Sequence, residues 1–132
     1  MPANEADRAE ETVRRYYESL REGEPLEIYF ADAGSTFKFG IGERLSGYEN
    51  VEKALRKQTR ETTDWQVESH NLRMTERDCH AWFHDTVRMA WKDTEKNRSY
   101  DFETRWSGTL EFDEDTDDWV FVGMHVSAEP DI

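Results

Sequence analysis

The residues best suited to chemistry lie near the end of the chain, in the run DFETRWSGTLEFDEDTDDWVFVGMHVS from Asp101 to Ser127. Arg105 stands there among residues that alternate as in a β-strand. An arginine that is buried without a partner is costly, so Arg105 predicts one of two arrangements. Either it binds the carboxylate of a ligand, or it forms a structural ion pair with Glu103 as the nearest partner.

The same run predicts two strands joined by a very acidic turn. Pairing Phe112 with Trp119 in an unbroken ladder places Trp106 opposite His125. We expect the Trp106 face to pack against a partner subunit. The opposite face is where we expect a ligand, and its candidate contacts are Arg105, Ser107 and Met124.

A second set of candidates lies in the strand-like run from Cys79 to Lys92. His80 and His84 have the i, i+4 spacing that binds a metal on a helix. On a strand four residues span about 13 Å, so one ion cannot bridge them and no metal is predicted. His84 shares a strand face with Trp82 and Arg88, and we include all three in the predicted ligand site. His84 would be an acid, a base or a hydrogen-bond partner there; the alternative is a structural histidine.

Tyr16 and Tyr17 stand on the apolar side of a predicted first helix. Both are expected mainly in the core, but a tyrosine on a helix can also aim its hydroxyl into a pocket. Tyr17 is therefore included in the predicted ligand site. Lys38, in the run TFKFG, alternates with Phe37 and Phe39 and is expected to point outward.

The rest of the chain supplies the elements that must position these residues. Three helices are expected, over residues 4–22, 25–32 and 46–62. Asn4 would cap the first, and Ser46 and Glu49 would form a capping box for the third. The expected strands cover residues 36–40, 65–75, 79–92, 100–112 and 119–128, with a loop over 41–45.

Helices first and long strands later predict an α+β fold rather than alternating βαβ units. Three helices cannot cover both faces of four long antiparallel strands. One face of the sheet is therefore expected to hold the helices and the other to meet solvent or another subunit. The length of 132 residues suits a single domain over residues 1–132.

Charge limits the classes of partner. The net charge of −13 argues against binding to nucleic acid or to anionic membranes. Of the 17 basic residues, five are Lys and twelve are Arg. An acid-rich, Lys-poor surface favours a halophilic protein that works in concentrated salt, where self-repulsion is screened; an ordinary acidic cytosolic protein is the alternative.

Cys79 is the only cysteine, which excludes an internal disulfide and a cysteine-based metal cluster. We expect it to be a buried, inert thiol. The polar N-terminus has no apolar segment typical of a signal peptide, and no apolar run approaches the length of a membrane span. A cytoplasmic location is expected, and no cofactor is predicted.

The run ETRWSG, followed by WVFVGMHVS, resembles the C-terminal strand pair of SnoaL-like proteins in the nuclear transport factor 2-like superfamily. It is also similar to the association (hub) domain of calcium/calmodulin-dependent protein kinase II, which has an E-T-R run, then a Trp and an H-x-S ending. The resemblance extends more weakly to the first two helices, to SGYENVEKAL and to ERDCHAWF. It therefore covers most of the chain.

The resemblance implies a cone, in which a strongly curved antiparallel sheet wraps around the helices and leaves a pocket between them. It also implies a homodimer through the outer sheet face. Arg105 matches a pocket arginine of the hub domain, whereas the hub's second pocket arginine falls on Thr86, two residues before Arg88.

Three functions follow from the resemblance and from Arg105. The first is a small-molecule-binding protein of unassigned activity whose pocket accepts an anionic or polar organic ligand. The second is an isomerase, cyclase or hydratase that acts on a small hydrophobic or polyketide-like substrate. The third is a non-catalytic oligomerisation module.

Overall fold

A computed structural model describes residues 8–128 of the chain. The helical elements are α1 (Arg8–Glu22), a single 3₁₀ turn (Glu27–Tyr29) and α2 (Tyr48–Glu61). The strands are β1 (Phe37–Gly40), β2 (Glu43–Ser46), β3 (Thr62–Ser69), β4 (Arg73–Glu76), β5 (His80–Asp93), β6 (Arg98–Asp113) and β7 (Asp118–Ala128).

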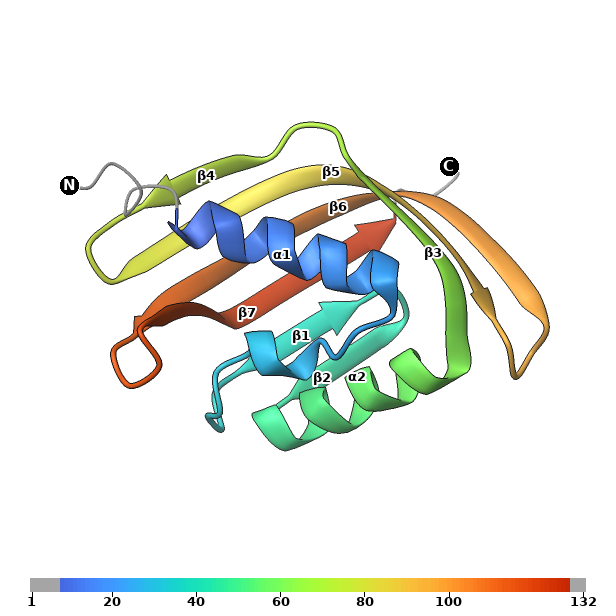
Figure 1. The fold of residues 1–132 in the computed structure, drawn as a ribbon, viewed down its shortest axis with the longest axis horizontal. Helices are drawn as coiled ribbons and strands as arrows, with labels where there is room; N and C mark the ends of the chain where they lie inside the picture. Colours follow the sequence, from blue (N-terminus) through green and yellow to red (C-terminus); the bar gives the residue numbers. More distant parts are fainter. Residues whose placement is uncertain (1–7, 129–132) are drawn as a thin grey trace.

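All seven strands form one curved sheet in the order β2-β1-β7-β6-β5-β3, with β4 also paired to β5. Helix α1 lies across the inner face of the sheet, and α2 lies at the end where β3 begins (Figure 1). The long β5–β6 hairpin continues past α1 and bends over that end (Figure 1). The outer face of the sheet carries no helix of the described residues, as the α+β pattern predicts.

Helix α1 forms because its apolar residues recur every three or four positions and reach the core together. Those buried residues are Ala9, Val13, Tyr16, Tyr17 and Leu20. Gly23 follows the helix at a φ of 72°, a left-handed conformation that glycine adopts without steric cost. This confirms the expected helix end, while the expected cap Asn4 lies outside the described residues.

The expectation of three helices is wrong, because the second is only a 3₁₀ turn. No side chain caps it at Leu26, and the chain is already extended at Phe30, which bridges to Phe121 of β7. The expected capping box is also absent. Ser46 belongs to β2, and α2 begins after Gly47 with no side-chain hydrogen bond at its cap.

The sheet is mixed rather than wholly antiparallel, because β1 runs parallel to β7. This is the physical consequence of the crossover from α1 through the 3₁₀ turn, which brings β1 to the free edge of β7. Two strand expectations also change. The run 65–75 divides into β3 and β4, both paired to β5, and the expected loop 41–45 contains most of β2, which pairs with β1.

One extra residue in β7 changes the predicted faces of the last hairpin. Phe112 pairs with Trp119 as expected, but the register shifts so that Leu110 faces Phe121 and Thr109 faces Gly123. This is a β-bulge at Val122. Phe121 and Met124 are three positions apart and both fully buried, which a regular period of two cannot achieve.

Beyond the bulge every pairing differs by one residue from the prediction. Trp106 pairs with Val126 and lies in the core, where its ring meets the rings of Tyr16 and Tyr17. His125 pairs with Ser107, is exposed, and lies edge-on to Phe39. The expected pairing of Trp106 with His125 is therefore wrong.

Candidate functional site

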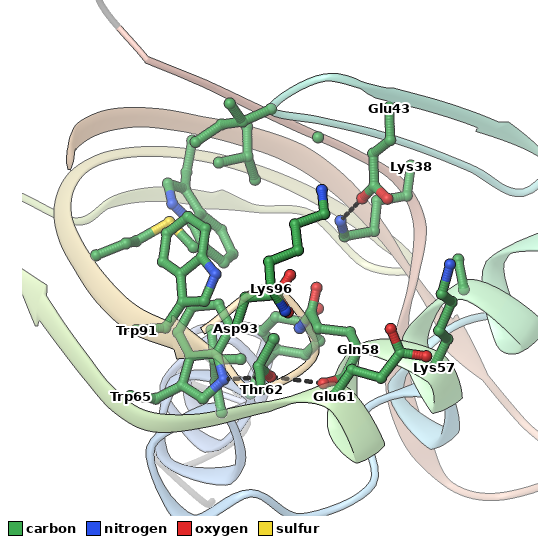
Figure 2. Close-up of a pocket in the computed structure, with 18 residues that line it drawn as sticks. Lys38, Glu43, Lys57, Gln58, Glu61, Thr62, Trp65, Trp91, Asp93 and Lys96 are labelled. Atoms are coloured by element: carbon green, nitrogen blue, oxygen red, sulfur yellow. Dashed lines mark hydrogen bonds and ion pairs between the residues drawn. The ribbon is translucent and has the colours of Figure 1, made fainter. Parts of the chain in front are cut away.

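A cavity of about 380 Å³ opens between α2, the β1–β2 hairpin and the far end of the β5–β6 hairpin (Figure 2). Its floor reaches α1 and the inner face of β6 and β7. The lining residues are Tyr16, Leu20, Lys38, Gly40, Ile41, Glu43, Ala54, Lys57, Gln58, Glu61, Thr62, Trp65, Met89, Trp91, Asp93, Lys96, Trp106 and Val126.

Two stacked indoles form one wall of the cavity. The rings of Trp65 and Trp91 lie 4.8 Å apart and within 13° of parallel. The Trp65 Nε1 donates to Thr62 Oγ1 at 2.9 Å, which fixes the ring at the start of β3 (Figure 2). The bulge in β3 includes Asp64 at a φ of 58° and brings Trp65 next to Trp91 of β5. The wall offers a flat apolar surface, and the indole N–H of Trp65 is already satisfied.

Tyr16 supplies an unpaired hydroxyl at the floor. The residue is only 1% exposed, and its hydroxyl makes no hydrogen bond to any described residue. Every fully enclosed side-chain nitrogen or oxygen of the described residues has a partner, so this hydroxyl must open into the cavity that Tyr16 lines. Burial, and then the negative charge of Glu43, hold the Tyr16 pKa far above its ordinary value. The hydroxyl is therefore a neutral donor.

A buried ion pair also lines the cavity. Lys38 is 6% exposed, and its Nζ donates to Glu43 Oε1 across the β1–β2 hairpin (Figure 2). Lys38 pairs in register with the buried Met124 of β7, so it points inward, and the expectation that it points outward is wrong. Glu43 lines the cavity together with Tyr16, and its charge contributes to the raised Tyr16 pKa, so Glu43 is our candidate for exchanging a proton with a ligand.

Charges of both signs surround the mouth. Lys57 and Glu61 come from α2, and Asp93 and Lys96 come from the β5–β6 turn (Figure 2). Asp93 Oδ1 accepts the backbone N–H groups of residues 95 and 96, each at 3.0 Å, and so holds that turn in place. With Lys38 and Glu43 the lining carries three lysines and three carboxylates, so the cavity as a whole has no strong preference for one sign of charge.

The sequence was compared with family models and with known proteins. A model of the SnoaL-like domain matches residues 9–130. The chain belongs to the SnoaL-like domain family. The search of curated proteins found no match for this SnoaL-like chain.

Solved structures share the fold at low sequence identity. A provisionally named dehydratase of the nuclear transport factor 2-like family from Streptomyces avermitilis has a TM-score of 0.82 at 15% identity, over 98% of this chain and 99% of that one. A ketosteroid isomerase-like protein from Erwinia carotovora atroseptica has a TM-score of 0.77 at 11% identity, over 98% and 100%. These likenesses establish the nuclear transport factor 2-like fold of this SnoaL-like domain.

The expected resemblance to the kinase hub domain is also confirmed. A provisionally named calcium/calmodulin-dependent protein kinase II association domain from Xanthomonas campestris has a TM-score of 0.74 at 14% identity, over 94% of this chain and 87% of that one. The structural match spans nearly the whole SnoaL-like domain and not only the last two strands from which the resemblance was first drawn.

Five residues of the predicted ligand site lie on the outer face of the sheet, away from the cavity. They are Trp82, His84, Arg88, Arg105 and Ser107, and none of them lines the cavity. The reason lies in the alternation of β5 and β6, whose inward positions are taken by buried residues such as Val87 and Trp106. The prediction that Arg105 faces the pocket is therefore wrong.

The outer-face arginines are engaged with groups of their own chain. Arg105 Nη2 donates to the carbonyl of Ala128 at 3.4 Å, and Glu103 lies near His70 rather than Arg105. Arg88 forms ion pairs with Asp101 at 2.7 Å and with Glu68 at 3.1 Å. Among the described residues Arg105 therefore forms neither the pocket contact nor the expected ion pair with Glu103.

The two remaining predicted site residues, Met124 and Tyr17, are buried on the inner face but do not line the cavity. Tyr17 donates through its hydroxyl to Asp85 Oδ2 at 2.9 Å. Asp85 is 3% exposed and also accepts from Ser69 Oγ at 2.6 Å and Asn71 N at 2.9 Å. Burial, and then Asp85, raise the pKa of Tyr17 far above its ordinary value. This network is sealed from the cavity and ties α1 to β3 and β5.

Sequence reasoning missed most of the cavity. The alternation in TFKFG correctly placed Lys38 on the opposite face of the strand from Phe37 and Phe39. The alternation alone did not show which of the two faces points inward. Trp65 and Trp91 meet only because β3 pairs with β5, and no local pattern reveals that pairing. The expected burial of Cys79 is wrong as well, since its thiol is exposed at the β4–β5 turn.

Neither a metal site nor a membrane-spanning helix is found in the described part of the chain. Within residues 8–128, no three His, Cys, Asp or Glu side chains gather closely enough to hold a metal ion. Within the same residues, no helix is long and apolar enough to cross a membrane.

Proposed function

We propose that this SnoaL-like domain binds a small organic molecule in its cavity, with a planar apolar body against Trp65 and Trp91 and a hydrogen-bond acceptor against Tyr16. The observation that carries this proposal is the Tyr16 hydroxyl, which is buried, open to the cavity and unpaired among the described residues. A buried polar group without a partner costs about 1–3 kcal/mol, and a ligand acceptor would recover that energy.

The polar group of the ligand that meets Tyr16 at the floor of the cavity should be uncharged. Lys38, the buried lysine of the lining, is already neutralised by Glu43, so it is not free to meet a buried anion. The volume of about 380 Å³ falls within the range of small-molecule sites in proteins. A ketone, ester or amide oxygen on an aromatic or polycyclic body fits these features.

A matched pair of probes tests this proposal. 2-Acetylnaphthalene carries a carbonyl acceptor, whereas 2-ethylnaphthalene has nearly the same shape without one. We expect Tyr16→Phe to weaken binding of the ketone about fivefold to tenfold, the value of one hydrogen bond, and to leave the hydrocarbon unchanged. Quenching of tryptophan fluorescence measures both affinities.

Tyr48→Phe is the control, because it also removes a tyrosine hydroxyl but at a residue that does not line the cavity. Equal affinity of the wild type for both probes would contradict the role of the hydroxyl. Absence of binding by either probe would contradict the cavity as a ligand site.

The second candidate function is acid–base catalysis of the dehydratase or isomerase kind, and one observation favours it. Glu43 lies close enough to Tyr16 for its charge to raise the tyrosine pKa. A carbonyl held by Tyr16 would therefore place its α-protons near a carboxylate. The structural relatives named as a dehydratase and as isomerase-like share this fold.

Exchange of the methyl protons of 2-acetylnaphthalene in D₂O, followed by NMR, tests this second function. General base catalysis contributes about 10²–10⁴-fold, so Glu43→Gln should slow exchange by at least about 10²-fold while Tyr48→Phe leaves it unchanged. Exchange no faster than in buffer alone would rule out Glu43 as the base for a ketone.

A further inference from the structure

A second hollow adjoins the cavity, between β2 and α2. It has a volume of about 290 Å³ and is lined by Arg44, Leu45, Ser46, Asn50, Lys53, Ala54 and Lys57. Ala54 and Lys57 line both hollows. This second hollow, here called the groove, therefore meets the cavity at Ala54 and Lys57 of α2.

The charge of this groove is opposite to that of the chain. The sequence has 30 acidic and 17 basic residues, yet the groove lining has three cations and no carboxylate. Four of the five lysines of the chain line either the cavity or the groove. A strongly acidic protein thus gathers four of its five lysines around this cavity and the adjoining groove.

The groove cations are exposed and carry no ion pair to a described carboxylate. Arg44, Lys53 and Lys57 all face solvent. Arg56, in the same helix, shows the contrast, because it pairs with Glu27 at 3.2 Å and with Glu52 at 3.0 Å. The cations of the groove therefore remain available to a group from outside the chain.

We propose that this groove is a second subsite, which binds the anionic group of a ligand whose planar body occupies the cavity. The group is a carboxylate, sulfonate or phosphate, held by Arg44, Lys53 and Lys57. This inference rests on the proposed function and adds the chemical class of the ligand: an amphipathic molecule, neutral where it meets Tyr16 and anionic where it leaves the mouth.

Each hollow suits the part of the ligand that it would bind. An anion in the groove stays partly in water and loses little hydration, while three cations within one groove strengthen its binding. The same cations also create a local positive potential on a protein that otherwise repels anions. They would raise the rate at which an anionic ligand finds the mouth.

Two fluorescent probes that differ by one charge test the subsite. N-Phenyl-1-naphthylamine is neutral, and 8-anilinonaphthalene-1-sulfonate is the same aromatic body with a sulfonate. We expect the wild type to bind the sulfonate more tightly. In the double variant Arg44→Gln, Lys53→Gln, which changes cations that line the groove but not the cavity, affinity for the sulfonate should fall roughly fivefold to tenfold, the value of one or two exposed charge contacts. The affinity for the neutral probe should change by less than about twofold.

Lys92→Gln is the control, because it removes a positive charge at a lysine that lines neither hollow. It should alter neither affinity. The preference for the sulfonate should also shrink as salt rises to about 1 M, where charges are screened within about 3 Å. Competition by 2-acetylnaphthalene reports whether each probe occupies the cavity.

The outcomes separate the two proposals. If the neutral probe binds and is displaced by 2-acetylnaphthalene, but the sulfonate shows no advantage or the double variant has no effect, the subsite is refuted and the cavity stands. If neither probe binds, or if 2-acetylnaphthalene displaces neither, the proposed function fails and the subsite with it.

Discussion

Two adjacent tyrosines should respond in opposite ways to the loss of a hydroxyl. Tyr17 donates to the buried Asp85, whereas the Tyr16 hydroxyl donates to no described residue. Replacing Tyr17 by Phe leaves Asp85 with Ser69 and Asn71 as its donors among the described residues. A hydrogen bond to a charged group contributes about 1.5–3 kcal/mol, so Tyr17→Phe should lower the free energy of unfolding by about 2 kcal/mol.

This loss converts to a measurable melting shift. With an unfolding entropy of about 2.1 cal/mol/K per residue, a chain of 132 residues loses about 7 °C in Tm for 2 kcal/mol. Tyr16→Phe should change Tm by less than about 2 °C or raise it, because it removes a buried polar group that has no partner. Differential scanning calorimetry of both variants makes the comparison.

The pair controls for ring packing, since each substitution keeps the ring and removes one oxygen from the same helix. Ser69→Ala removes a second donor to Asp85 and should destabilise in the same direction as Tyr17→Phe. Equal melting shifts for Tyr16→Phe and Tyr17→Phe would refute the distinction between the paired and the open hydroxyl.

Three further predictions concern pH, the buried ion pair and assembly. The pKa values of Tyr16 and Tyr17 are raised on folding, so the native state holds these two protons more tightly than the unfolded state. The free energy of unfolding should be constant below about pH 10 and fall above it by about 1.4 kcal/mol per pH unit for each tyrosine. Urea unfolding at several pH values measures this slope, which should be smaller in Tyr16→Phe and in Tyr17→Phe. The side chains of Lys38 and Glu43 are 8% and 34% exposed, so Glu43→Gln, which strands the more buried charge, should cost about 1–3 kcal/mol and exceed the cost of Lys38→Met in urea unfolding. The homodimer through the outer sheet face predicts that Trp82→Asp, a change at a tryptophan 43% exposed on that face, lowers the mass seen by light scattering; a wild-type monomer at every concentration would contradict the dimer.

The sequence predicted the elements better than their faces. Apolar spacing located α1, and the polar turns located β5, β6 and β7 to within two residues. Local pattern also marked Phe112 and Trp119 as partners. These features depend on residues close together in the chain, where periodicity and turn chemistry act directly.

The site was missed for a different reason, because it depends on long-range geometry. The bulge at Val122 moves the later residues of β7 to the opposite face, so that Phe121 and Met124 are both buried. Nothing local in the run WVFVGMHVS requires an extra residue there. Trp65 and Trp91 lie in different strands far apart in the sequence. Their rings stack to form a wall of the cavity because β3 pairs with β5.

The stacked indoles also give the cavity an optical signal of its own. Two indole rings 4.8 Å apart and nearly parallel couple their electronic transitions, and such a pair produces circular dichroism bands of opposite sign that depend on the angle between the rings. A ligand that enters beside Trp91 or displaces Trp65 would change those bands. Occupancy of this cavity can therefore be followed in the unmodified protein, including with molecules that have no fluorescence and carry no label.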